Sequence, residues 1–186
     1  MRISGKSRAK AVRLRSFLFL AAAFMAAALL LGVHARPASA PDDDPIDRIR
    51  FGEVRLLMER SRFEAVAGRG QPLPGCIGCA VYAYFPKLKL TVSVSDGLGT
   101  YKHRVTQIST KDRAYRVLDI GVGDSLRAGA DKLSRSGLTP ADAGSGNGAV
   151  FAKGDFRMEL RDYDRDGTID ELWTEVADRL PESIVR

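Results

Sequence analysis

The chain has 186 residues and a formal net charge of +6. Six of its 29 Lys and Arg residues lie in the first 35 positions, which hold no Asp or Glu, and the remaining 23 are balanced by 23 acidic residues. Because the basic excess is confined to one end, it does not indicate a nucleic-acid partner. The part beyond this end, about 150 residues, is long enough for a domain with a hydrophobic core.

The N-terminal segment has the order of a bacterial-type secretory signal. Basic residues precede an apolar run of 17 residues, Phe17 to Val33, and small residues follow it. Cleavage fits after Ala35 or after Ala40, and we favour Ala35 because a proline follows the second position. Residues 1–35 are therefore predicted to be a signal peptide. The alternative is an uncleaved membrane anchor, since 17 residues approach the shortest spanning helices.

Both alternatives place the rest of the chain outside the cytoplasm. A cleaved signal predicts a periplasmic or extracellular protein, whereas an anchor predicts an inner-membrane protein with a periplasmic domain. Residues 36–47 form a polar linker, in which Asp44 can cap a helix that begins at Pro45.

The next segment predicts one helix and then several strands. Apolar residues recur at helical spacing over 53–66, and glycines follow. Strands are predicted beyond a loop rich in Gly and Pro, and over residues 88–95 polar and apolar residues alternate as they do in a strand with one solvated face. These strands are expected over residues 80–85, 88–95, 103–110 and 115–120.

A second helix is predicted with Asp124 or Ser125 as its N-cap and Gly137 as its terminator. The elements expected after it are a Gly-rich loop and two strands, over 149–153 and 155–162. The segment 169–180 fits either a strand or an amphipathic helix. We favour a strand that pairs with residues 156–160.

The two halves of the chain, residues 48–112 and 113–180, show the same order of helix, Gly-rich loop and strands, and a tail of residues 181–186 follows. Their hairpins align without a gap when residues 64 apart are matched, as Val92 with Phe156. The pattern predicts an α+β fold with helices packed on an antiparallel sheet. Two tandem helix-plus-sheet repeats would explain the match, and so would unrelated hairpins with similar polar tips.

The acidic stretch DYDRDGTID offers oxygen atoms at alternate positions, and Ca²⁺ takes six to eight such ligands. The candidate ligands are Asp162, Asp164, Asp166, the Thr168 carbonyl and Asp170. The spacing matches the first nine positions of an EF-hand loop, but Trp173 replaces the closing Glu and a predicted strand leads in. The stretch resembles D-x-D-x-D-G-x-x-D loops that join two strands in extracellular repeat proteins.

That resemblance implies a structural calcium site that clamps a hairpin. The alternative is a solvated turn, because Asp-Gly is favoured at hairpin tips. In that case Arg161 and Arg165 could offset part of the negative charge without a metal.

Cys76 and Cys79 are predicted to form a local disulfide in an oxidising compartment. A thioredoxin-like redox motif would need a helix after the first Cys, and zinc would need more ligands than His103 provides.

No set of acid, base and nucleophile can be assigned, so we expect a protein that is not an enzyme. Three aromatic residues belong either to the core or, if their strand has a bare face, to a binding patch: Tyr82, Tyr84 and Phe85.

The segments IGVGDSLRAGADKLSRSG and FRMELRDYDRDGTIDEL resemble small bacterial envelope proteins with a helix on an antiparallel sheet. These are the outer-membrane-assembly lipoproteins of SmpA/OmlA type and the β-lactamase-inhibitory proteins, which repeat such a unit twice. Ala130 lies near the position of the usual Val, the lipobox Cys is missing, and the usual Pro soon after Gly137 is displaced to Pro140. The residues that carry the resemblance are Gly123, Ser125, Leu126, Leu133 and Gly137.

The resemblance implies a binding or scaffolding module, or a secreted or anchored inhibitor of another protein. Its partner would be an envelope or extracellular protein. Contact with the membrane would be made only through an uncleaved N-terminal segment.

Overall fold

The computed structural model describes residues 44–76, 79–96, 99–142 and 148–177. The predicted signal peptide or anchor, most of the linker and the tail lie outside these ranges. The chain divides into a unit of residues 1–42 and a unit of residues 43–186, and every described residue belongs to the second.

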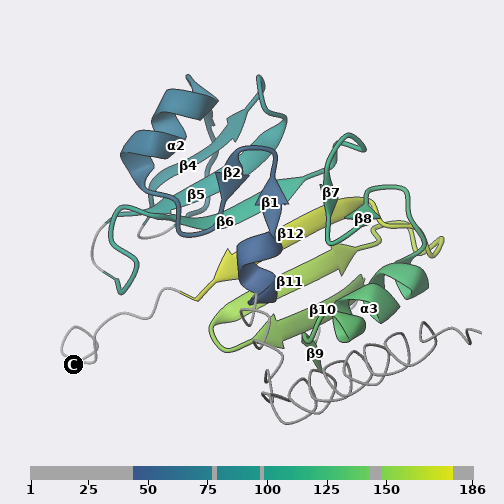
Figure 1. The fold of residues 1–186 in the computed structure, drawn as a ribbon. Coiled ribbons are helices and arrows are strands. Elements are labelled where there is room, and N and C mark those ends of the chain that lie inside the picture. Colours follow the sequence, from purple (N-terminus) through teal and green to yellow (C-terminus); the bar gives the residue numbers. More distant parts are fainter. Residues whose placement is uncertain (1–43, 77–78, 97–98, 143–147, 178–186) are drawn as a thin grey trace, which may run out of the picture. The chain divides into compact units, whose positions relative to one another are not determined.

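An eight-stranded antiparallel sheet dominates the second unit, in the order β3-β4-β5-β6-β12-β11-β10-β9 (Figure 1). The pairing of β6 with β12 therefore joins the strands of the two halves in one continuous sheet. In sheet order the strands are β3 (Gln71–Pro72), β4 (Cys79–Phe85), β5 (Leu90–Ser95), β6 (Val105–Thr110), β12 (Glu171–Val176), β11 (Phe156–Arg161), β10 (Gly148–Lys153) and β9 (Thr139–Ala141).

The helices are short, with eight residues in α2 (Arg60–Ala67) and ten in α3 (Leu126–Arg135). Strands account for 43% of the described residues and helices for 18%, so the fold is mainly β. The predicted α+β class, with helices packed on a sheet as two tandem repeats, is therefore wrong. The remaining elements are η1 (Pro45–Arg48) and two small hairpins, β1 (Arg50–Phe51) with β2 (Val54–Arg55) and β7 (Arg116–Val117) with β8 (Ile120–Gly121).

Backbone conformation explains why the first predicted helix is shorter than expected. Its N-terminal part contains β2, and Leu57 has a φ of +61°, which a right-handed helix does not accommodate.

The gapless match between the hairpins of the two halves fails because their strands pair in different registers. Val92 lies opposite Ile108, whereas Phe156 lies opposite Val176, so the two hairpins do not share the register that the match requires.

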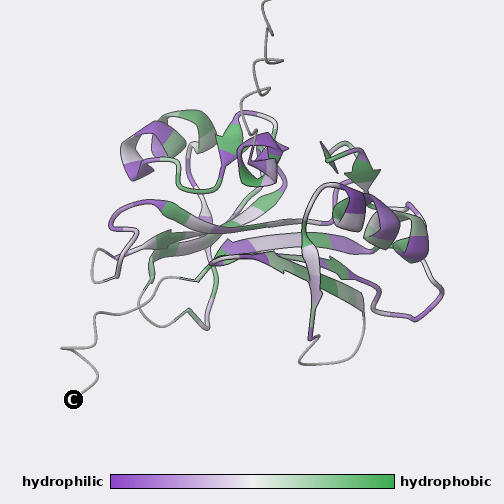
Figure 2. Ribbon diagram, turned by 60° about the horizontal axis from the view of Figure 1, so that its bottom comes forward, coloured by the Kyte–Doolittle hydropathy of each residue, from purple (hydrophilic) through white to green (hydrophobic). Residues whose placement is uncertain are grey.

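One face of the sheet carries the core. The row formed by Ala83, Val92, Ile108, Thr174, Met158 and Phe151 crosses six strands and is buried throughout. Both helices lie on this side of the sheet (Figure 2). Phe63 of α2 packs edge-on against Phe85 with ring centroids 4.8 Å apart. Gly129 of α3 approaches so closely that a Cβ there would lie 2.8 Å from Leu160 Cδ1.

The opposite face of the sheet has no described helix over it (Figure 2). We call it the open face, and its side chains are mostly polar or aromatic. Its residues lie in two long rows and one short row, which are Tyr82–Ser93–Gln107–Glu175–Arg157, Tyr84–Thr91–Ser109–Trp173–Glu159 and Glu171–Arg161.

Several local predictions are confirmed. The segment at 171–176 is a strand that pairs with β11, and α3 is followed by Gly137 at a φ of +85°. The Asp44 carboxylate accepts a hydrogen bond from the Ile46 amide and caps η1. The predicted strand over 115–120 is instead the tight hairpin of β7 and β8, because Leu118 and Asp119 both have positive φ.

Candidate functional site

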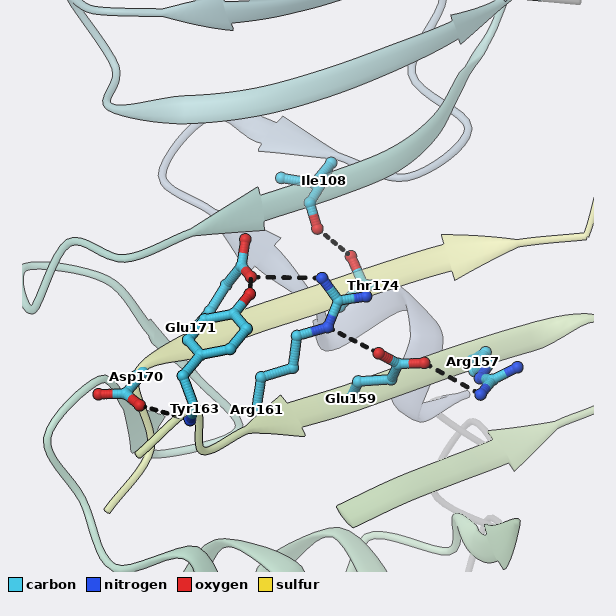
Figure 3. Close-up of polar contacts among 8 residues, drawn as sticks. All are labelled: Ile108, Arg157, Glu159, Arg161, Tyr163, Asp170, Glu171 and Thr174. Carbon is cyan, nitrogen blue, oxygen red and sulfur yellow. Dashed lines mark hydrogen bonds and ion pairs between the residues drawn. The ribbon is translucent and has the colours of Figure 1, made fainter. Parts of the chain in front are cut away.

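A chain of ion pairs runs across β11 and β12 on the open face (Figure 3). Arg161 Nε lies 2.7 Å from a Glu159 carboxylate oxygen, and Arg161 Nη1 lies 3.3 Å from Glu171 Oε2. Glu159 also pairs with Arg157 at 3.0 Å, and the Tyr163 hydroxyl donates to Glu171. The alternating charges at positions 157, 159 and 161 were a signal for this network that the sequence reading did not use.

Burial and charge shift the pKa values of these groups. Burial lowers the pKa of Arg161, but the hydrogen bond to Glu159 and the neighbouring carboxylates outweigh it and raise the pKa overall. Burial is also the main reason why the pKa of Tyr163 is raised, with the bond to Glu171 adding to it. Burial raises the pKa of Glu175 against the opposing effect of Arg157. Both shifts are directed away from neutral pH, where Arg161 is charged and Tyr163 is protonated at their ordinary pKa values.

The network also contacts Trp173 of the open face. The Arg161 guanidinium lies 4.7 Å from the centroid of the Trp173 ring, within cation–π range. Tyr82 and Tyr84, two of the three predicted patch residues, lie on this face and are partly exposed. Phe85, the third, points to the other face, where it is 3% exposed and belongs to the core.

The acidic loop connects β11 to β12, as a strand–loop–strand unit. Asp162 is 5% exposed, and its two oxygens accept hydrogen bonds from the amides of Arg165 at 2.7 Å and Gly167 at 2.9 Å. Asp164 and Asp166 are exposed, and they accept from amides two residues further along. Arg161 does not neutralise this loop, because its guanidinium pairs with Glu159 and Glu171.

Three of the predicted calcium ligands come together. Carboxylate oxygens of Asp162, Asp164 and Asp166 all lie within 4.8 Å of one another. Oxygens that bind one Ca²⁺ ion, each about 2.4 Å from it, lie at most about 4.8 Å apart, so this spacing is compatible with three of the six to eight ligands that the ion takes. Asp170 is not in this group, and its carboxylate accepts a hydrogen bond of 2.7 Å from the Tyr163 amide.

The loop is anchored to the start of α3 by backbone hydrogen bonds. The Leu126 amide donates to the Gly167 carbonyl at 2.8 Å, and the Ile169 amide donates to the Asp124 carbonyl at 2.9 Å. Thr168, whose carbonyl was a predicted ligand, forms an isolated β-bridge with Ser125. A cation bound in the loop would thus act on the β11–β12 turn and on α3 together.

A groove of about 650 Å³ lies where the open face meets the residues that follow β6. Side chains from β4, β5, β6, β12 and the turn of residues 111–113 line it. It contains three cationic and two acidic side chains, from Lys89, Lys111, Arg113, Asp112 and Glu171.

Cys76 and Cys79 form a disulfide, as predicted, with a Cα–Cα distance of 5.7 Å. The second cysteine is the first residue of β4, so the bridge lies at the beginning of a strand that contributes two tyrosines to the open face.

Among the described residues, no helix has the length and hydropathy needed to cross a membrane.

No model of a known protein family matches the sequence, and no curated protein matches it. Among solved structures, the chain is similar to an extracellular protein containing an SCP domain from Bacillus anthracis, with a TM-score of 0.45 and 9% sequence identity. The similarity covers 69% of this chain and 45% of the other, so the chain spans less than half of that protein.

Proposed function

We propose that the protein is an exported, non-catalytic binding module of the bacterial cell envelope, which contacts another envelope or extracellular protein through its open face. The observation that carries this function is the difference between the two faces of the sheet. One face forms the core together with side chains of the two short helices and the two small hairpins, whereas the other presents rows of polar and aromatic side chains. An antiparallel sheet often has one solvated face, and the Tyr, Trp and Arg side chains on this one are types that protein interfaces favour.

The composition of the open face fits a protein contact. Interfaces are enriched in Tyr, Trp and Arg, and this face carries Tyr82, Tyr84, Trp173, Arg157 and Arg161. The two arginines already form ion pairs, and Trp173 is held by Arg161. Side chains fixed before binding lose less conformational entropy when a partner docks.

Calcium would stabilise one edge of this surface. Asp162, Asp164 and Asp166 would hold the ion, which would offset the repulsion among their carboxylates. The loop adjoins the open face, because Tyr163 lies within it and donates to Glu171 of β12. Calcium would therefore support the position of Tyr163 and Glu171.

Export is supported by the basic and apolar N-terminal segment and by the disulfide, which is stable in an oxidising compartment. The periplasm and the extracellular space both satisfy this requirement.

A photocrosslinking experiment tests the function. Tyr82 or Tyr84 is replaced by photoreactive benzoylphenylalanine in the full chain, expressed in its own host, and the envelope is irradiated. A discrete crosslinked protein is expected from both positions on the open face. The control carries the same group at Arg62, an exposed position on α2. The same product from position 62, or none from positions 82 and 84, would contradict a contact through the open face.

A further inference from the structure

The groove at the end of the open face has a floor of free hydroxyl groups. Tyr84, Thr91 and Ser109 lie in one row across β4, β5 and β6 and line the groove. Their hydroxyls form no hydrogen bond to another described residue; Tyr84 and Thr91 are partly exposed, and Ser109 is 4% exposed. They are therefore available to donate to, and accept from, a polar ligand.

The acidic groups of the groove are already neutralised from within the protein. The Asp112 carboxylate lies 3.0 Å from Lys89 Nζ, and it also accepts a hydrogen bond from the Ala114 amide. Glu171 is paired with Arg161, which is not among the groove-lining residues, and accepts from Tyr163. Neither carboxylate is left to balance another cation.

Two cations of the groove have no carboxylate partner. Lys111 and Arg113 form no ion pair with any described residue, and Lys111 Nζ lies instead 4.6 Å from the centroid of the Tyr163 ring. Two like charges that line one groove repel each other and attract an anion. Lys111 and Arg113 therefore carry the positive charge of the groove that no carboxylate neutralises.

The turn that carries both cations is fixed by hydrogen bonds on each side. The Thr110 hydroxyl donates to the Lys89 carbonyl and accepts from the Asp112 amide, both at 3.0 Å. The Tyr115 hydroxyl donates to the Leu88 carbonyl at 2.6 Å. A turn held in this way presents its charges in one arrangement and lowers the entropy cost of binding.

We propose that this groove binds a small acidic sugar, in which Lys111 and Arg113 hold a carboxylate or phosphate and the three hydroxyls hold the sugar hydroxyls. Its volume of about 650 Å³ lies within the range of small-molecule sites. This ligand goes beyond the proposed contact with a protein and does not depend on it, because the groove is complete within one chain.

Titration calorimetry and amide NMR shifts of the mature protein test the ligand class with four probes. Glucuronate carries a carboxylate, glucose 6-phosphate carries a phosphate, glucose carries no charge, and inorganic phosphate carries no sugar. Binding of glucuronate or glucose 6-phosphate, with amide shifts at Thr91 and Ser109, is expected, and the tighter of the two identifies the anion. Glucose and inorganic phosphate are expected to bind at least about tenfold more weakly.

The double variant Lys111→Gln/Arg113→Gln is expected to weaken binding of the acidic sugar by about tenfold or more. The control Arg62→Gln/Lys102→Gln removes the same charge from exposed positions outside the groove and is expected to bind as the wild type does.

Equal loss in both double variants would overturn the site, because it would reduce binding to net charge. Failure of both acidic sugars to bind, or binding of glucose with the same affinity, would also overturn it. Inorganic phosphate that binds as tightly as glucose 6-phosphate would overturn the role of the hydroxyl floor. Crosslinks from positions 82 and 84 would be unaffected by any of these results, so the two functions fail separately.

Discussion

The Asp162 carboxylate accepts a hydrogen bond of 2.9 Å from the backbone amide of Gly167, five residues further along the chain. Its other oxygen accepts from the Arg165 amide at 2.7 Å, and the residue is 5% exposed. Asp162 is therefore the buried carboxylate that accepts two amide hydrogen bonds across the acidic loop, whereas the exposed Asp164 and Asp166 each accept one from an amide two residues away. Within the acidic motif, Asp162 thus has a structural role of its own, and Asp164 and Asp166 are the residues whose main role would be to bind a cation.

Replacement of Asp162 by Ala is expected to lower the free energy of unfolding by roughly 2–4 kcal/mol in the presence of a chelator, because two amides lose a charged acceptor in a buried place. Urea denaturation of the mature protein measures the change. Asp164→Ala in chelator is the matched control and is expected to cost under about 1 kcal/mol. Equal costs for the two variants would contradict the special role of Asp162.

Calcium is expected to raise the melting temperature of the mature protein, because an ion that binds only the native state stabilises it by about 2.7 kcal/mol at a hundredfold excess over Kd. Thermal melting with calcium and with chelator measures the effect. Asp164→Ala is expected to abolish it and to leave the melting temperature in chelator nearly unchanged. The absence of a shift at millimolar calcium would exclude a calcium site in the loop.

Replacement of Gly129 by Ala is expected to destabilise the protein by roughly 1–3 kcal/mol, although Ala is the better helix former. A Cβ at this position would lie 2.8 Å from Leu160 Cδ1 and 3.0 Å from Ile169 Cδ1, so these two fully buried side chains, or α3 itself, would have to shift. Denaturant unfolding gives the difference. Ser134→Ala, at an exposed position of the same helix, should be neutral or slightly stabilising.

Replacement of Glu175 by Gln is expected to stabilise the protein at pH 7. Burial raises the pKa of this carboxyl in the folded state, so the folded protein resists its ionisation and loses stability as the pH rises from the unfolded-state value of about 4.3 through the raised value. Gln does not ionise, so the variant does not lose this stability. The advantage of the variant should therefore shrink towards zero below about pH 4, as urea denaturation over a pH series would show.

Asp124→Asn should give the opposite pH dependence. The hydrogen bond from Arg116 is the largest cause of the lowered pKa of Asp124, and the Gly121 amide adds to it. This carboxylate therefore contributes stability above its unfolded-state pKa of about 3.9, which is lost as the pH falls through the lowered value. The variant should be less stable at pH 7, and its deficit should close in acid. Parallel curves for the two variants would contradict both assignments.

Local patterns predicted the strands well, and the helices less well. Alternation identified β11, in which buried and partly exposed residues alternate, and β5, although nearly all of β5 is buried on both faces. The helical spacing over 53–66 was misleading. Some of the buried apolar residues of this segment lie in the β1–β2 hairpin, and others lie in α2. A periodic pattern of apolar residues indicates which side chains are buried, but not the backbone conformation. Here a hairpin followed by a short helix buries the residues that a single helix was predicted to bury.

The acidic loop was recognised because its ligands are close in the sequence, and the structure brings Asp162, Asp164 and Asp166 together. The groove could not be recognised in this way, since its lining comes from four strands and a turn. Sequence spacing also did not separate Phe85, which is in the core, from Tyr84, which is on the open face.

The sequence by itself determined the local features: the alternation of the strands, the cap of Asp44, the disulfide and the acidic loop, all of which depend on residues within a few positions of one another. Only the tertiary structure decided that β6 pairs with β12 and that both helices cover the same face. That choice leaves the other face of the sheet open and brings Ser109 beside Trp173. It depends on contacts between residues more than sixty positions apart, whose free energy exists only when the whole sheet has formed.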